Sequence, residues 1–202
     1  MLLQDARPFA RDDGISAGSD GGLSEGLIAL DGFFRIYPAW MLPSWNAFEE
    51  WRFAWGDLAV GWEFVGGTAF GDQFARRASE QGVCVLDAYT LSIARHYDGI
   101  DELLRVEPAL FLDENEGLIE AIVRRLGAPA QEEHVAFAPP PRITGDMLEE
   151  RAMKLPRALS MILNGDVATQ AERLVGRAVD RVETWIDADG RARLRLCVGG
   201  AS

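Results

Sequence analysis

Residues 58–88 read LAVGWEFVGGTAFGDQFARRASEQGVCVLDA and decide the fold. Leu58 to Phe64 and Thr68 to Arg76 are two aromatic-bearing runs joined by Gly66-Gly67, a pattern typical of two strands with a glycine turn. Gly82 to Ala88 supplies a third run after a short polar connection. Parallel strands need a crossover of a dozen or more residues, so these short connections predict an antiparallel meander.

The segment before this sheet is expected to add a strand and an aromatic helix. Residues 33–37 form a β-type run that Pro38 stops. Ser44 can cap a helix, and the residues that recur behind it at helical spacing are Trp45, Phe48, Trp51 and Trp55. An aromatic face of this kind could stack on a sugar or a base, but it is more typical of a core helix, which is our interpretation. Further upstream, residues 23–30 predict a short helix.

The C-terminal half predicts helices and a final hairpin. Helices are expected over residues 98–112 and 114–126, the second stopped by Gly127. Further helices are expected over 146–163, with an interruption at Pro156, and over 166–179. Apolar and polar residues alternate over 182–187 and 191–198, on both sides of the turn sequence Ala188-Asp189-Gly190, which is a hairpin signature. Between these parts, Pro139-Pro140-Pro141 excludes regular structure and predicts a domain boundary.

Together these patterns predict an α+β fold, with a central antiparallel sheet covered by helices and a smaller C-terminal helical and hairpin unit. The expected organisation is a flexible N-terminal arm at 1–22, an α+β domain at 23–138, and C-terminal helices plus a β-hairpin at 143–202. The arm is assigned from its many Gly, Ser and Asp residues, which cannot bury enough apolar surface to stay ordered alone.

The charge of the chain limits its partners. The 202 residues carry a formal net charge of −12, with a sequence pI near 4.6. Nucleic acid and anionic membrane surfaces would be repelled, whereas a basic protein would be attracted. The acidity could equally serve only solubility, and the charge alone does not separate these two readings.

Signals for export and membrane insertion are not found in the sequence. The N-terminus lacks the basic start and continuous apolar region of a signal peptide, and no apolar run reaches the length of a membrane span. Cys84 and Cys197, the two cysteines, lie in strand-like runs and are expected to be buried, reduced thiols. These features predict a cytoplasmic protein.

No pattern for a catalytic, cofactor or metal site is recognised. His96 and His134 lie in different predicted segments without a spaced ligand set, so they are interpreted as surface or structural histidines. Residues 66–72 resemble a phosphate loop only in their glycines, because the Gly-Lys-Ser/Thr ending is missing. We therefore expect no enzyme, no cofactor and no metal.

The acidic residues gather in one segment. Residues 98–133 hold ten acids against three arginines, a net charge of −7 and more than half of that of the chain. The segment is either an ordinary solvated helix surface or the docking face for a basic partner. In the second case the predicted partner-binding residues are Asp101, Glu102, Asp113, Glu114 and Glu116.

Residues 31–112 resemble bacterial proteins of the SUKH superfamily, which includes the yeast cell-wall assembly regulator, and the neighbouring GAD-like type VI immunity families. The resemblance is carried by Asp31-Gly32-Phe33-Phe34, Trp45-Asn46, Trp51-Arg52, Thr68-Ala69-Phe70-Gly71-Asp72-Gln73-Phe74 and Gly82-Val83-Cys84-Val85-Leu86-Asp87. It implies that the domain at 23–138 is SUKH-like. It also implies an immunity protein that binds a cognate toxin, often a nuclease, and contributes no catalytic residue.

Two other functions stay open at this point. One is an adaptor or structural subunit of a bacterial protein assembly, for which the C-terminal unit would supply a second interface. The other is an enzyme whose catalytic groups follow no recognised pattern. The sequence leaves the identity of the partner and the oligomeric state open.

Overall fold

The computed structural model describes residues 25–78, 80–174 and 176–199. The predicted arm at 1–22 lies outside them. Six strands form an antiparallel sheet in the order β1-β2-β3-β4-β5-β6, so each strand pairs with its neighbours in the chain. They are β1 (Leu27–Ala29), β2 (Phe34–Ile36), β3 (Trp62–Thr68), β4 (Gln73–Arg77), β5 (Val83–Leu86) and β6 (Ile93–Tyr97). The predicted antiparallel meander is confirmed, and with it the α+β fold class.

The turn between the two central strands lies four residues later than predicted. Gly66 and Gly67 are inside β3, and the chain reverses over residues 69–72. A Cβ on Gly66 would lie 2.5 Å from the carbonyl oxygen of Arg35, and one on Gly67 would collide with the carbonyl oxygen of Asp72. The glycines therefore allow the strands to approach closely and do not form the turn.

Helix α2 (Ile100–Leu126) covers one face of the sheet as a single helix, where two had been predicted. Pro108 lies inside it, and Gly127, with φ of 74°, follows it as the predicted stop. The first half of α2 packs Leu103 against the sheet side chains Phe34, Phe74 and Val85. Its second half packs against a two-stranded sheet of β7 (Glu133–Phe137) and β8 (Ala152–Pro156).

The predicted helix from Ser44 to Trp55 is wrong beyond its first turn. Helix α1 spans only Leu42–Trp45, and short 3-10 helices follow at Arg52–Ala54 and Gly56–Ala59. The predicted burial is nevertheless right for three of the four rings: Trp45, Trp51 and Trp55 are at most 2% exposed. Phe48 is 60% exposed. Each buried indole donates a hydrogen bond: Trp55 Nε1 donates to the distant carbonyl oxygen of Met161 at 2.8 Å, and Trp51 Nε1 donates to the nearby carbonyl oxygen of Trp45. The Nε1 of Trp45 donates to the side chain of Gln73 at 3.2 Å.

The part after the proline run also differs from the expected two helices. After α3 (Pro141–Thr144), the part of the first predicted helix before Pro156 is replaced by a 3-10 helix at Glu149–Arg151 and β8. Its remainder is helical as the start of α4 (Arg157–Ala171), which begins directly after the interruption predicted at Pro156 and continues into the second predicted helix. Asp166, expected to cap a helix, lies in the middle of α4. The short helix expected at 23–30 is likewise replaced, in its described part, by strand β1 and the start of a 3-10 helix at Leu30–Gly32. The predicted hairpin is confirmed as β9 (Val179–Ile186) and β10 (Ala192–Val198), and a 3-10 helix at Glu172–Leu174 precedes it.

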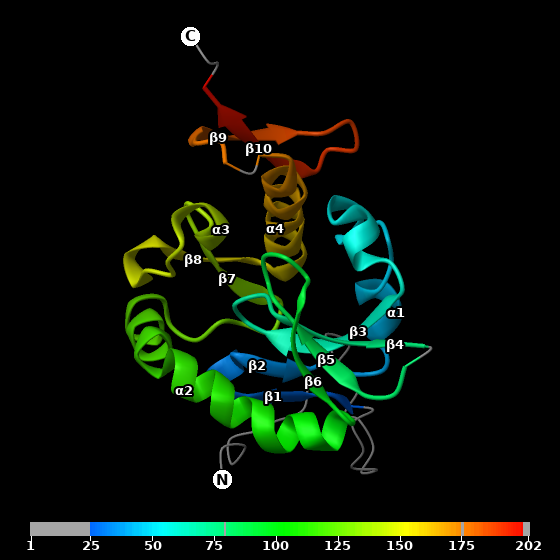
Figure 1. Ribbon diagram of the computed structural model, residues 1–202. Coiled ribbons are helices and arrows are strands. Elements are labelled where there is room, and N and C mark those ends of the chain that lie inside the picture. The colour runs from blue at the N-terminus through cyan, green and yellow to red at the C-terminus, as the bar shows by residue number, and fades with distance from the viewer. Residues whose placement is uncertain (1–24, 79, 175, 200–202) are drawn as a thin grey trace.

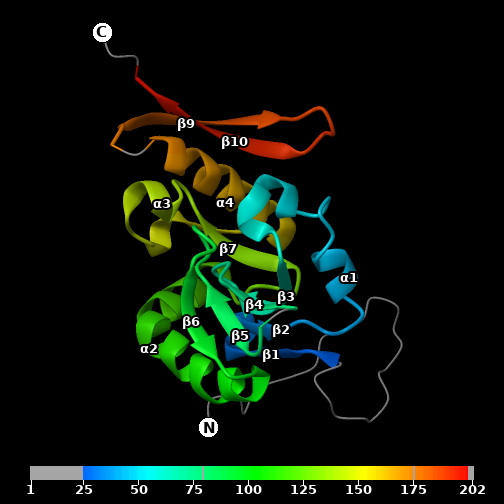
Figure 2. The ribbon, with the colours of Figure 1, turned by 45° about the vertical axis from the view of Figure 1, so that its right-hand side comes forward.

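The two predicted units are linked by several contacts across residues 138–143. Strand β7 from the first unit pairs with β8 from the second, from Glu133↔Pro156 to Phe137↔Ala152. Helix α4 packs on the sheet face opposite α2, with Met161 in the same core cluster as Trp51, Trp55 and Phe64. The hairpin lies across α4 on its side away from the sheet (Figures 1 and 2). The proline run is therefore a surface connection within one packed body.

Candidate functional site

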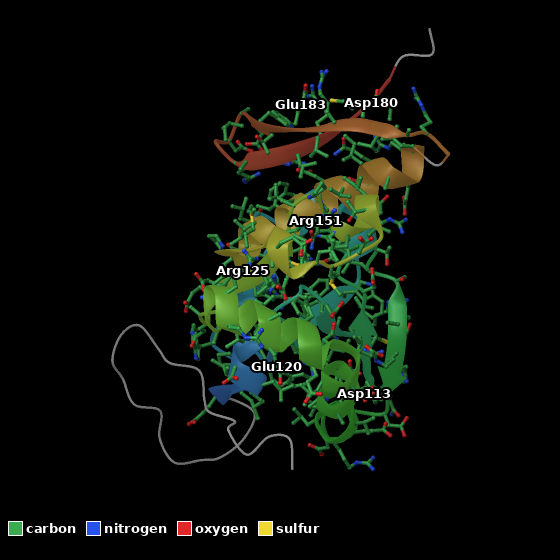
Figure 3. The ribbon with its side chains drawn as sticks, turned by 90° about the vertical axis from the view of Figure 1, so that its left-hand side faces the viewer. Asp113, Glu120, Arg125, Arg151, Asp180 and Glu183 are labelled. Atoms are coloured by element: carbon green, nitrogen blue, oxygen red, sulfur yellow. The ribbon has the colours of Figure 1, made fainter. Side chains whose placement is uncertain are left out.

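The acidic outer surface of α2 is the first candidate site. Of the five predicted partner-binding residues, four are exposed and Glu102 is partly buried. At 100° per residue, Asp101, Glu102, Asp113 and Glu116 fall within an arc of about 120°, and Asp101 and Glu116 are about 22 Å apart along the axis. Glu120, which is not among the predicted residues, is exposed and lies on the same side (Figure 3). The helix thus brings four of the five residues to one face.

The ion pairs on this surface are few. Glu102 accepts a hydrogen bond from the backbone N–H of Asp98 at 2.8 Å and lies 3.6 Å from Arg105. Within the described ranges, the carboxylates of Asp101, Asp113 and Glu116 have no ion pair. Arg105 and Arg124 lie on the same side, so the face is acidic but less so than the −7 of the whole segment suggests.

Glu107 is one of the acids of the segment that do not contribute to this face, because its side chain points inward. Its side chain is fully buried, and Arg95 binds it through two hydrogen bonds of 2.6 and 2.8 Å. The hydroxyl of Tyr97 donates to the same carboxylate at 2.5 Å. Burial, followed by this hydrogen bond to a carboxylate, raises the pKa of Tyr97. Glu107, Arg95 and Tyr97 thus form a hydrogen-bonded cluster that joins β6 to α2.

A cleft of about 360 Å³ opens beside this ion pair, between the ends of β5 and β6, the middle of α2 and Met147. Its apolar lining includes the rings of Phe70, Tyr89 and Phe111. Its charged lining consists of three carboxylates and one guanidinium: Asp72, Asp87, Glu114 and Arg95. Arg95 is already bound to Glu107 and lies 3.2 Å from Glu114. The cleft therefore combines aromatic walls with an excess of negative charge.

Asp72 is held in the turn between β3 and β4. Its carboxylate accepts hydrogen bonds from Thr68 Oγ1 at 2.9 Å and from the backbone N–H of Ala88 at 3.0 Å. Burial raises the pKa of this carboxyl to about 6, although both hydrogen bonds act in the opposite direction, and the charges of Asp87 and Glu107 raise it further. The residue belongs to the Thr68–Phe74 motif, so that motif forms both the turn and one wall of the cleft.

The fifth predicted residue, Glu114, lies apart from the other four. It faces β6 and lines the cleft, where it meets Arg95. Asp72, Asp87, Tyr89 and Arg95 were not selected from the sequence. Their spacing follows no motif, because it is the turns of the sheet that bring them together.

The two histidines lie in different places. His96 is exposed on β6, with Nε2 3.3 Å from the carbonyl oxygen of Gln81. His134 is fully buried in β7, and neither ring nitrogen has a hydrogen-bond partner among the residues described. Burial, and then the charges of Arg35 and Arg157, keep the pKa of His134 well below its usual value. Within residues 25–78, 80–174 and 176–199, no three His, Cys, Asp or Glu side chains gather as a metal site would require.

Comparison with known proteins gives a distant structural similarity only. No protein-family model and no curated protein sequence matches the chain. A similar solved structure is that of Atu4351 from Agrobacterium tumefaciens, with 16% sequence identity and a TM-score of 0.44. The match covers 82% of this chain and 76% of that one. In the described part of the chain, the helices are too short or too polar to cross a membrane.

Proposed function

We propose that this protein is a non-catalytic, cytoplasmic immunity protein that neutralises a basic bacterial toxin, such as a nuclease, by binding it. The observation that carries the proposal is the set of exposed carboxylates on α2, of which Asp101, Asp113 and Glu116 have no ion pair among the described residues. The resemblance of residues 31–112 to immunity families supports the same class of partner. A nuclease binds its substrate through a basic groove, and an acidic helix face is complementary to such a groove.

The cleft beside α2 supports the proposal with a place for a basic side chain. A guanidinium is stabilised by aromatic faces and by carboxylates, and the cleft supplies Phe70, Tyr89 and Phe111 together with Asp72, Asp87 and Glu114. Because Glu114 lines the cleft, the cleft opens next to the acidic helix. An arginine of the toxin would enter the cleft while its basic surface faces α2.

Electrostatic attraction of this kind acts mainly on the association rate and is screened by salt. The test uses the toxin captured by affinity purification from the native cell, with binding kinetics measured at low and high ionic strength. Replacing Asp101, Glu102, Asp113, Glu114 and Glu116 by Asn or Gln should slow association by about tenfold or more at low salt. The fold should be retained, because exposed charges contribute little to stability individually.

A matched control removes the same number of charges elsewhere. Five other exposed acids can be replaced in the same way: Glu49, Glu50, Asp57, Asp146 and Glu172. This control variant should associate at close to the wild-type rate, since the charges removed are not on α2. If both variants associate equally slowly, the net charge of the protein and not the face on α2 explains the effect. An unchanged association rate in the α2 variant would refute the proposal.

A further inference from the structure

The two edges of the β9–β10 hairpin differ in their hydrogen bonding. In an antiparallel pair, alternate residues direct their backbone N–H and C=O groups to the partner strand or outward. The N–H of Asp187 donates to the carbonyl oxygen of Arg191 at 3.0 Å, which sets the alternation of the hairpin as far as the pair Arg181↔Cys197. Residues 182, 184 and 186 of β9, and residues 192, 194 and 196 of β10, therefore direct their backbone groups outward, and the alternation ends at a register shift next to residue 180.

Helix α4 closes the outer edge of β10. Asp166 Oδ2 accepts from the N–H of Leu194 at 2.8 Å, and Gln170 Oε1 accepts from the N–H of Leu196 at 2.9 Å. Gln170 Nε2 donates to the carbonyl oxygen of Leu194 at 2.8 Å. Arg193 also binds Asp166, so the carboxylate is held in place. Side chains thus take the position that another strand would occupy.

The outer edge of β9 has no such closure in the part of the chain that the structure describes. The strand is eight residues long, and among its side chains Trp185 is 41% and Ile186 64% exposed. An unpaired edge of this length, with apolar side chains along it, is a template for the addition of another strand.

We propose that β9 pairs with β9 of a second copy of this chain, antiparallel, around a twofold axis at Val182. This register places Val182 opposite its symmetry mate and residue 180 opposite Thr184, and both Val182 and Thr184 direct backbone groups outward. It also places Arg181 of each copy opposite Glu183 of the other, in the pairs whose side chains approach most closely. A twofold axis at Arg181 or at Glu183 would instead place like charges opposite each other.

The charges are available for this pairing. Within one copy, Arg181 Nη2 lies 2.7 Å from Glu183, but their side chains are 70% and 41% exposed. Exposed ion pairs are weak, so each residue can bind across the interface without a large loss of stability. The dimer would contain one continuous four-stranded sheet, in which β10 and α4 flank the new pairing on both sides.

The test measures the molar mass of the full chain over a range of concentrations by light scattering or sedimentation. The wild-type protein should shift from its monomer mass of 22.2 kDa to twice that value as concentration rises. Arg181→Glu and Glu183→Arg should each raise the dimer dissociation constant by about tenfold or more, because like charges then oppose. The double variant restores opposite charges across the axis and should restore the dimer.

A second pair of variants tests the backbone. The N–H of Val182 points away from β10, so Val182→Pro removes a donor of the new interface without breaking the hairpin ladder. It should abolish the dimer, whereas Val182→Ala should retain it, and thermal melting checks that both variants are folded. A monomer at every concentration would overturn the proposal. So would a dimer that ignores Glu183→Arg, since that result requires another surface or register. The measurement of molar mass needs no toxin, so its result is independent of the proposed function.

Discussion

The substitution Gly165→Ala tests how α4 is joined to the core. In an isolated helix, alanine is favoured over glycine by about 1 kcal/mol. Here a Cβ at residue 165 would lie 2.7 Å from Trp55 Cδ1 and 2.9 Å from the carbonyl carbon of Ala54. The indole cannot move aside easily, because it is buried and bonded to the carbonyl oxygen of Met161. Overpacking of this kind costs about 1–3 kcal/mol, near the upper end where backbone is involved.

The two effects oppose each other, and the clash is the larger. Gly165→Ala should therefore lower the free energy of unfolding by about 1–2 kcal/mol, or the melting temperature by about 2–8 °C for a chain of this size. Gly117 provides the control, since it is exposed in α2 and a Cβ there would meet nothing within 4 Å. Gly117→Ala should raise the melting temperature by about 1–4 °C.

Circular dichroism during heating and in urea measures both variants. If Gly165→Ala melts at or above the wild-type temperature, α4 is not packed against Trp55 as described. Two separate unfolding transitions in the wild-type protein would contradict the single packed body in another way.

Three further predictions concern buried ionisable groups. Glu107→Ala should cost about 3 kcal/mol of stability, because the hydroxyl of Tyr97 loses its partner and Arg95 keeps only its contact with the exposed Glu114. Glu63→Ala removes an exposed ion pair and should cost under about 1 kcal/mol in the same urea titration. Folding lowers the pKa of His134, so its contribution to stability is complete above about pH 6.5 and is lost as the pH falls. In a folded His134→Leu variant, the free energy of unfolding should no longer contain this dependence on pH. Folding raises the pKa of Asp72 to about 6, so this residue stabilises the fold at low pH, and the contribution is lost as the pH rises from about 4 through 6. The free energy of unfolding of an Asp72→Asn variant should therefore fall more steeply than that of the wild type when the pH is lowered. Unfolding free energies at pH 5 and pH 7 check both signs, and equal slopes in all three proteins would contradict both assignments.

Local sequence patterns were sufficient to predict the elements whose hydrogen bonds join residues that are close together in the chain. The meander was predicted because its connections are too short for parallel crossovers. The last hairpin was predicted from the alternation on both sides of Ala188-Asp189-Gly190, and in the structure the N–H of Gly190 donates to the carbonyl oxygen of Asp187 in that turn. The burial of Trp51 and Trp55 followed from their size and apolar character, independently of the secondary structure that carries them. The acidity of α2 could likewise be counted from the residues.

The candidate site depended more on tertiary structure. The sequence selected Asp101, Asp113 and Glu116, and the helix places them on one face because its period is local. It did not show that Glu107 in the same helix is buried, because the partner that neutralises it, Arg95, comes from another element. Nor did it place Asp72, Asp87 and Arg95 around one cleft, which requires the folded order of β4, β5 and β6.

By itself, then, the sequence determined the central strands of the antiparallel meander, the hairpin, most of the large apolar core residues and the acidity of α2, all of which follow from periodicity, turn chemistry and composition. It did not show the outer strands β1 and β6 or the exposure of Phe48. Only the tertiary structure decided the conformation of residues 45–55 and 146–179. Partners far away in the chain compete there with helix propensity: the bond from Trp55 to Met161 spans 106 residues, and β8 pairs with β7 across the proline run. A buried backbone group must find a hydrogen-bond partner, and where the nearest one lies is a property of the packed fold.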